Sequence, residues 1–245
     1  MRIPRIYQAD SAPWEPDFEL TLDAEAAHHL GRVLRVSVGQ PIELFNGDGQ
    51  NYAAEIIAVT KRDISVRILS ATPNHSESPL RVHLAQGISR GERMDFVLQK
   101  SVELGVHEIT PLFTERCTVK LSGDRLLKKQ QQWQKIVISA CEQSGRSVVP
   151  VVHLPVSLSQ WFSDLPTGLR LTLDPYAPTP LQQLTERPDQ LTLLIGPEGG
   201  LSDEEVELAS QQQFLPVRLG PRILRTETAA LTALSVIQYQ FGDLA

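Results

Sequence analysis

The sequence predicts an α/β protein in which a small β-rich domain precedes a larger domain built on a mostly parallel sheet. Residues 1–70 form short strand-like runs separated by hairpin signals. Residues 71–79, A-T-P-N-H-S-E-S-P, are polar and bounded by proline, as is typical of a linker. From residue 80 to residue 245, strand-like and helix-like segments alternate, which favours a parallel sheet covered by helices. We therefore expect domains at 1–70 and 80–245.

The first domain contains three runs that alternate between apolar and polar residues. They cover Ile42–Phe45, Asn51–Val59 and Ile64–Leu69. The intervening N-G-D-G and K-R-D segments are hairpin signals, because these residues favour tight turns. One helix is expected over Asp23–Leu34, with Asp23 near its N-cap.

The second domain alternates between buried-strand and amphipathic-helix patterns. Its expected strands are Arg81–Ile88, Glu108–Phe113, Val148–His153, Leu169–Leu173, Leu191–Ile195 and Val217–Leu219. Helices are expected over Arg93–Val106 and Asp124–Ser144, which end at Gly105 and Gly145, respectively. The order of these elements predicts a largely parallel sheet.

Composition narrows the possible functions. A hydrophobic content of 41% over 245 residues provides a sizeable core, and a formal net charge of −6 argues against broad electrostatic binding of nucleic acid. Basic residues exceed acidic ones over residues 81–135, whereas acidic residues exceed basic ones over 136–245. Any RNA contact should therefore be local. The sequence has two cysteines and no apparent signal peptide or membrane-spanning run, so we expect the protein to reside in a reducing cytoplasm.

Residues 191–230 contain the same pattern twice: an apolar strand, a Gly/Pro turn and a helix start. In the first copy, Leu191–Ile195 precedes the turn Gly196–Gly200, and Ser202 with Glu205 forms a capping box. Such a turn often binds phosphate. Here a lysine of the P-loop type is absent, and Asp203 and its acidic neighbours would repel an anion. The pattern therefore favours an uncharged or cationic ligand.

The second copy runs from Val217–Leu219 through Gly220-Pro221 to Thr226, the expected N-cap of a helix that ends at Phe241. A tight strand-to-helix turn could explain either copy alone. The repetition of the pattern is what favours a ligand site.

The same residues resemble a known family. G-P-E-G-G-L-S followed by L-G-P-R-I-L-R-T-E-T-A is similar to the bacterial 16S ribosomal RNA (uracil-N3)-methyltransferase family, within the SPOUT superfamily of S-adenosylmethionine (SAM) enzymes. The resemblance extends to M-R-I-P-R-I-Y at the start, S-R-G-E-R-M-D-F at Ser89–Phe96, Q-K-S-V-E-L-G-V at Gln99–Val106 and A-C-E-Q-S-G-R at Ala140–Arg146. It covers nearly the whole chain. One difference is Asp174, where histidine is more usual in the family.

The resemblance implies a PUA-like RNA-binding barrel followed by a SPOUT domain with a C-terminal trefoil knot. The knot would involve residues 191–200 and 217–230. The resemblance also implies a homodimer, which we expect to bury the apolar side of the helix Thr228–Phe241 together with the neighbouring knot loops. The expected small-residue face of this helix, which could equally pack on its own sheet, comprises Ala229, Ala230, Ala233 and Leu234.

The resemblance further implies SAM as cofactor and a uridine of 16S ribosomal RNA, in the small ribosomal subunit, as target. The residues expected to bind SAM are Leu173, Ile195, Gly196, Gly199, Gly200, Leu219, Gly220, Ile223, Leu224, Thr226 and Ala229. The expected RNA-binding cations are Arg2, Arg5, Arg32, Arg90 and Arg222. Each of these arginines could instead belong to an ordinary solvated surface. Catalysis is assigned to Arg225, which would stabilise charge on the uracil, with Glu198 as the alternative participant.

The sequence also allows several alternatives. Salt bridges to Glu198 or Glu227 would give Arg222 and Arg225 a purely structural role. Cys141 could act as a nucleophile, but its apolar helical surroundings favour a buried thiol. Neither the histidines nor the cysteines show metal-ligand spacing, so no metal is expected. A methyltransferase for another RNA site and a non-enzymatic RNA-binding protein stay open. A nucleotide hydrolase would need a loop lysine and metal carboxylates, which this sequence lacks.

Overall fold

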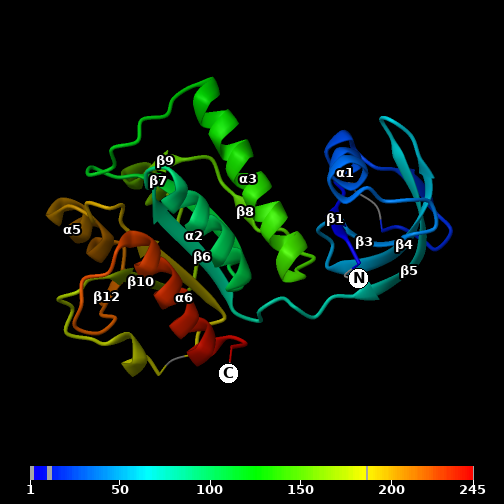
Figure 1. Ribbon diagram of the computed structural model, residues 1–245. Helices are drawn as coiled ribbons and strands as arrows, with labels where there is room; N and C mark the ends of the chain where they lie inside the picture. Colours follow the sequence, from blue (N-terminus) through cyan, green and yellow to red (C-terminus); the bar gives the residue numbers. More distant parts are fainter. Residues whose placement is uncertain (1–2, 10–12, 186, 245) are drawn as a thin grey trace. The chain divides into compact units, whose positions relative to one another are not determined.

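A computed structural model describes residues 3–9, 13–185 and 187–244 (Figure 1). The chain divides into two compact units. The N-terminal unit comprises Met1–Glu77 together with Cys141–Val149, and the C-terminal unit comprises Ser78–Ala140 together with Pro150–Ala245. Within the described ranges, no helix has both the length and the apolar character needed to cross a membrane.

The N-terminal unit contains a five-stranded mixed sheet in the order β1-β3-β4-β5-β2. Its strands are β1 (Arg5–Tyr7), β2 (Glu19–Thr21), β3 (Pro41–Phe45), β4 (Gln50–Val59) and β5 (Ile64–Pro73). β1 pairs in parallel with β3, and the other pairs are antiparallel. The three expected hairpin strands correspond to β3, β4 and β5. Alternate residues such as Ile56 and Val66 are fully buried and form the core of this unit.

The helical segment of the N-terminal unit changes its hydrogen-bonding pattern along its length. Asp23 is the N-cap of α1 (Ala24–His28), and its carboxylate accepts hydrogen bonds from the N–H groups of Glu25 and Ala26. The chain continues as a π-helix, η1 (His29–Leu34), and ends at Arg35, where φ is 51°. The single helix expected over 23–34 is therefore an α-helical turn followed by a π-helical segment.

The observed division of the chain differs from the expected boundaries. Residues 71–73, expected to belong to a linker, extend β5 and pair with residues 50–52 of β4. Residues 141–149 join the N-terminal unit because the Arg5 guanidinium donates hydrogen bonds to the carbonyls of Cys141 and Arg146. Asn74 likewise donates a hydrogen bond to the carbonyl of Gly145. Contacts between residues so far apart in the sequence cannot be recognised from local sequence patterns.

The C-terminal unit contains a parallel sheet in the order β12-β10-β11-β6-β7-β8, with β9 also paired to β7. Its strands are β6 (Arg81–Gly87), β7 (Glu108–Phe113), β8 (Val151–Val152), β9 (Val156–Ser157), β10 (Leu169–Leu173), β11 (Gln190–Ile195) and β12 (Leu215–Val217). This confirms the predicted α/β class. The central strands β6 and β11 are buried along almost their whole length, as expected for a parallel sheet that is covered on both faces.

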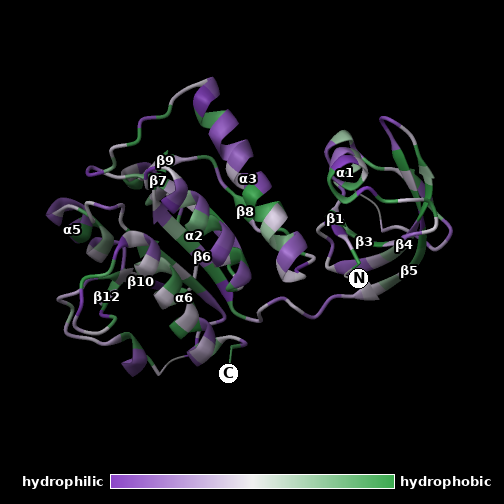
Figure 2. Ribbon diagram, in the orientation of Figure 1, coloured by the Kyte–Doolittle hydropathy of each residue, from purple (hydrophilic) through white to green (hydrophobic). Residues whose placement is uncertain are grey.

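Helices alternate with these strands. They are α2 (Glu92–Glu103), α3 (Asp124–Ser144), α4 (Leu158–Trp161), the 3-10 helix η2 (Leu181–Gln183), α5 (Asp203–Gln211) and α6 (Thr226–Phe241). Figure 2 shows polar residues along the first turns of α3 and more apolar residues farther along it. α2 and α6 pack against each other. Trp161, Phe162 and Phe214 form an aromatic cluster that packs with buried residues of the sheet.

The small-residue face of α6 packs inside its own chain. Ala230, Ala233 and Leu234 are fully buried, whereas Ala229 is partly exposed. Ala230, Ala233 and Leu234 therefore cannot form a subunit interface, because they already belong to the core of the C-terminal unit. The rest of the expected interface, on this helix and the neighbouring knot loops, stays a prediction. The trefoil knot stays a prediction.

Candidate functional site

The two repeated loops lie together at the end of the sheet. We call Gly196–Leu201 the first loop and Arg218–Arg225 the second loop. Thr226 follows the second loop, and its hydroxyl donates a 2.7 Å hydrogen bond to the Gly196 carbonyl. The same hydroxyl accepts a 2.9 Å hydrogen bond from the Gln86 side chain. The prediction of Thr226 as N-cap is wrong, because Arg225 occupies that position, and the Thr226 side chain instead joins the loops.

The first loop requires glycine for two different reasons. A Cβ atom on Gly196 would lie 2.9 Å from backbone atoms of Gly200 and Leu201, which is too close for normal contact. Gly200 has a φ of 71°, a conformation that L-residues with side chains rarely adopt. The predicted capping box of Ser202 and Glu205 is confirmed and begins α5 directly after this loop.

A cavity of about 680 Å³ opens between the two loops. It adjoins Leu173, Ile195 and Val217, which are the last residues of β10, β11 and β12. Ligands of open α/β sheets bind at this edge, outside the carboxyl ends of the strands. Every residue expected to bind cofactor lines the cavity except Gly220. Those residues are Leu173, Ile195, Gly196, Gly199, Gly200, Leu219, Ile223, Leu224, Thr226 and Ala229.

Other parts of the lining were missed from the sequence. Arg116, from the segment after β7, donates hydrogen bonds of 3.1 Å and 3.0 Å to the carbonyls of Gly199 and Leu201. No local pattern connects this arginine with the first loop. Asp203 and Glu207, one turn apart on α5, also line the cavity. Their four-residue spacing was an available signal, since it places them on the same helix face.

Of the three arginines in the second loop, Arg222 and Arg225 have exposed side chains. Arg222 lines the cavity, whereas Arg225 does not. Among the residues that the structure describes, neither side chain forms a hydrogen bond or an ion pair. The alternative in which they pair with Glu198 or Glu227 is therefore wrong. Both carboxylates instead face Arg93 of α2, at 3.2 Å and 3.9 Å.

Glu198 is an ionised carboxylate at neutral pH. Its partial burial would raise the pKa, but hydrogen bonds from the Arg90 and Glu198 backbone N–H groups and from Arg93 outweigh that effect and lower the pKa below its usual value. The Arg90 N–H lies 2.9 Å from the Glu198 carboxylate. A carboxylate stabilised in this way is a weak proton acceptor. This favours Arg225 over Glu198 as the group that assists proton loss.

The expected RNA-binding arginines occupy different environments. Arg90 is exposed, and its Nε donates a 2.6 Å hydrogen bond to the Thr118 hydroxyl. Arg32 is exposed on η1 of the N-terminal unit. The side chain of Arg5 is only 9% exposed, and it forms an ion pair with Glu43. Its guanidinium also bonds to the backbone within the same unit, so the RNA role expected for Arg5 is not supported. Arg2 lies outside the described residues.

Cys141 is buried, as expected. Burial raises the pKa of its thiol to about 12. The thiolate needed for attack on a pyrimidine is therefore scarce at neutral pH.

Asp174, the position that differs from the family pattern, lines the cavity, and its carboxylate accepts a 2.8 Å hydrogen bond from the Tyr176 N–H.

Comparison with known proteins identifies the family. Residues 22–69 match a family described as an RNA methyltransferase PUA domain, and residues 76–238 match one described as an RNA methyltransferase domain. A protein of Buchnera aphidicola, the ribosomal RNA small subunit methyltransferase E, is 38% identical over 245 residues, covering 100% of this chain and 99% of that protein. The chain belongs to the ribosomal RNA small subunit methyltransferase E family.

Two solved structures share the fold over the full length of this member of the methyltransferase E family. The ribosomal RNA small subunit methyltransferase E of Neisseria gonorrhoeae, bound to S-adenosyl methionine, has a TM-score of 0.92 and 37% identity. A Legionella pneumophila protein in complex with the bound cofactor SAM has a TM-score of 0.95 and 49% identity. Each comparison covers 100% of both chains.

Proposed function

We propose that this protein uses SAM to methylate N3 of a uridine in the 16S ribosomal RNA of the small ribosomal subunit. The observation that carries the proposal is the cavity between the first and second loops. It lies at the carboxyl ends of three parallel strands and combines glycine backbone with acidic side chains. Full-length similarity to methyltransferase E supports the same conclusion.

The lining of this cavity suits SAM chemically. The ends of β10 and β11 and the glycines of the first loop offer backbone groups and close approach for the adenosine and methionine parts. Glu198, Asp203 and Glu207 provide negative charge that complements a sulfonium. SAM supplies an electrophilic methyl group when it is bound. The residues of this chain have to orient the uracil and stabilise the charge that forms on it.

Removing the N3 proton of the uracil costs little free energy. For a pKa about two units above neutral, deprotonation costs roughly 3 kcal/mol. A cation beside the uracil carbonyls can supply this stabilisation as negative charge develops. Arg225 is exposed beside the cavity, and its guanidinium has no partner among the described residues. We assign this role to Arg225, and Glu198 remains the alternative participant.

RNA contact should be local, because the whole chain is acidic. Arg90 and Arg222 are exposed on the C-terminal unit, and a guanidinium can bind phosphate or stack on a base. Arg32 offers a further exposed cation in the PUA-like unit.

We also propose that the protein acts in the cytoplasm, where it would meet ribosomal RNA. We further propose that it forms a homodimer, as the resemblance to SPOUT enzymes implies.

Separate calorimetric titrations with SAM, ATP and RNA test this function. We expect SAM to bind with one molecule per chain, ATP not to compete with it, and RNA to bind independently. Binding of RNA without SAM would favour the non-enzymatic alternative. Preferential binding of ATP would point to a nucleotide-hydrolysing enzyme instead.

A further inference from the structure

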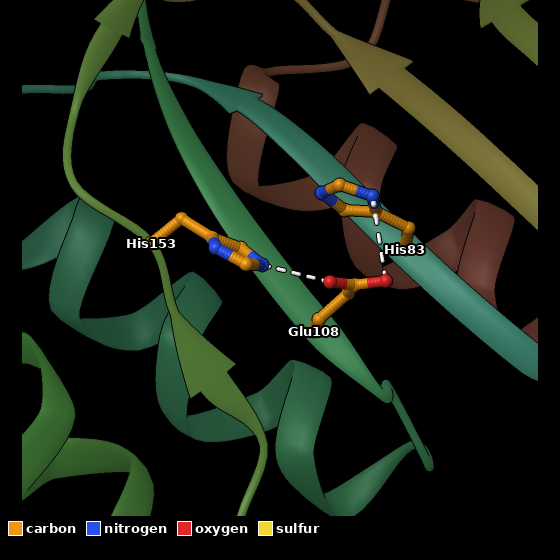
Figure 3. A group of neighbouring side chains, drawn as sticks. All are labelled: His83, Glu108 and His153. Carbon is orange, nitrogen blue, oxygen red and sulfur yellow. Dashed lines mark hydrogen bonds and ion pairs between the residues drawn. The ribbon is translucent and has the colours of Figure 1, made fainter. Parts of the chain in front are cut away.

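A second group of polar side chains lies away from the cavity between the loops. His83 is in β6, Glu108 is the first residue of β7, and His153 follows β8 (Figure 3). His83 and Glu108 are direct partners in the parallel register. The backbone N–H of His153 donates a 2.9 Å hydrogen bond to the carbonyl of Ile109. This His83–Glu108–His153 cluster therefore sits near the amino end of β7, whereas the proposed SAM cavity adjoins the carboxyl ends of other strands.

The three side chains converge on one small volume. His153 Nε2 lies 2.7 Å from one Glu108 carboxylate oxygen, and His83 Nδ1 lies 3.7 Å from the other. One potential ligand atom from each residue lies within 4.8 Å of the others. A tetrahedral ion with bonds of about 2.0–2.2 Å holds its ligand atoms roughly 3.4 Å apart. The side chains of His153 and Glu108 are 43% and 34% exposed, so small rotations can bring them to that spacing.

His83 is the buried member of the cluster, and one of its ring nitrogens has no hydrogen-bond partner. The residue is 7% exposed, and its Nδ1 atom is buried without a hydrogen-bond partner. The 3.7 Å separation from Glu108 is too long for a hydrogen bond. A buried ring nitrogen without a partner costs about 1–3 kcal/mol. Its other nitrogen, Nε2, lies 2.8 Å from the Thr110 hydroxyl. When Nε2 donates to Thr110, the Nδ1 lone pair points toward Glu108 and is available to a ligand.

We propose that His83, Glu108 and His153 bind a divalent transition-metal ion, with Zn²⁺ as the best fit. Two imidazole nitrogens and one carboxylate form a ligand set that zinc accepts, whereas Mg²⁺ and Ca²⁺ prefer oxygen ligands. The fourth coordination position faces an adjoining cavity of about 740 Å³, which is lined in part by Gln160, Trp161 and Asp164. Water or a small anionic ligand can occupy that position.

Metal titration of the full-length protein tests the site. Protein freed of metal by chelation is titrated calorimetrically with Zn²⁺, and with Co²⁺ while visible absorption is recorded. We expect one ion per chain and the intense absorption of four- or five-coordinate Co²⁺. Glu108→Gln and His153→Ala should each weaken Zn²⁺ binding by at least about 10-fold, the lower end of what loss even of a supporting group costs a metal site. His75→Ala is the matched control, because it removes an exposed histidine outside the cluster.

The controls keep the test independent of folding and of the proposed function. Thermal unfolding of the metal-free variants shows whether each folds, and the partly exposed Glu108 and His153 are less critical to the core than His83. SAM titration should give the same affinity with and without Zn²⁺. Failure to bind one Zn²⁺ per chain would overturn the metal site. Equal Zn²⁺ affinity in folded Glu108→Gln, His153→Ala and His75→Ala proteins would also overturn it.

Discussion

Arg225 is the residue on which the proposed chemistry depends most. It occupies the N-cap position of α6 without a side-chain capping bond, and its guanidinium is exposed beside the cavity. Arg225→Ala should lower the methyl-transfer rate by roughly 10²–10³-fold, the cost of losing one donor to a developing charge. SAM affinity should change little, because the interaction forms with the uracil. Single-turnover methylation and calorimetry measure the two effects separately.

Two further variants sharpen this test. Arg225→Lys keeps the charge but loses the planar guanidinium, so partial rescue would indicate electrostatics and no rescue would indicate bidentate placement. Arg218→Ala removes a nearby arginine that does not line the cavity and should leave the rate unchanged. If Arg225→Ala lost SAM affinity in step with activity, Arg225 would belong to the cofactor pocket and Glu198 would become the better catalytic candidate.

Cys141 provides a second test at the residue scale, because a nucleophilic cysteine would imply a different reaction. Burial raises the pKa of its thiol to about 12, so at pH 8 roughly one molecule in 10⁴ carries the thiolate. We expect Cys141→Ala to retain methyl transfer within about twofold in the same assay, since no step uses the thiol. A correctly folded but inactive Cys141→Ala protein would contradict this mechanism.

The first loop is the element that forms one side of the cavity. Gly200 adopts a φ of 71°, and a β-branched residue there is strained even though the space around it is open. Gly200→Val should therefore distort the loop and abolish measurable SAM binding while the protein stays folded. Gly123→Val is the matched control, because Gly123 has a φ of 53° and open space but does not line the cavity. Calorimetry and thermal unfolding of both variants check this.

Unchanged SAM affinity in Gly200→Val would place the cofactor elsewhere. Equal loss of affinity in Gly123→Val would show that the effect is a general loss of stability rather than a change in the loop.

Elements with strong local signals could be predicted from the sequence. The bounds of β7, β10 and α3 agree with the expected ranges, because apolar periodicity and terminal glycines act over a few residues. The capping box of α5 was predicted for the same reason. Thr226 was misplaced by one position, because its hydroxyl serves a contact with Gly196, thirty residues earlier in the chain. Side-chain preference alone does not distinguish a threonine that caps a helix from one whose hydroxyl bonds to a distant backbone carbonyl.

At the scale of the whole molecule, the candidate site was predictable where its residues are contiguous in sequence. Both loops lie within residues 191–230, so their repetition was visible. Arg116 and the His83–Glu108–His153 cluster were not, because the order of strands in the sheet brings them into place. The division of the chain was missed for the same reason, since residues 141–149 reach the N-terminal unit through contacts such as Arg5 with Cys141.

The proposed homodimer is a prediction about the assembled molecule. The small-residue face of α6 is buried in its own unit, so a dimer must use other surfaces. Ile223 in the second loop and Tyr239 on α6 are 76% and 67% exposed and provide apolar area for such a contact. Sedimentation equilibrium at micromolar concentration should give twice the chain mass of 27.2 kDa. A monomer at that concentration would remove the dimer and any active site shared between chains.

Methylation of uridine N3 in 16S ribosomal RNA is the reaction that we propose for this protein. The most direct test incubates the protein with SAM and small ribosomal subunits, or naked 16S RNA, from cells that lack the corresponding gene. The RNA is then digested to nucleosides and analysed by mass spectrometry. We predict 3-methyluridine at about one per 16S RNA in the wild-type reaction and far less with Arg225→Ala. A methyl group on C5 of the pyrimidine or on ribose, or no methylation of either substrate, would exclude this reaction.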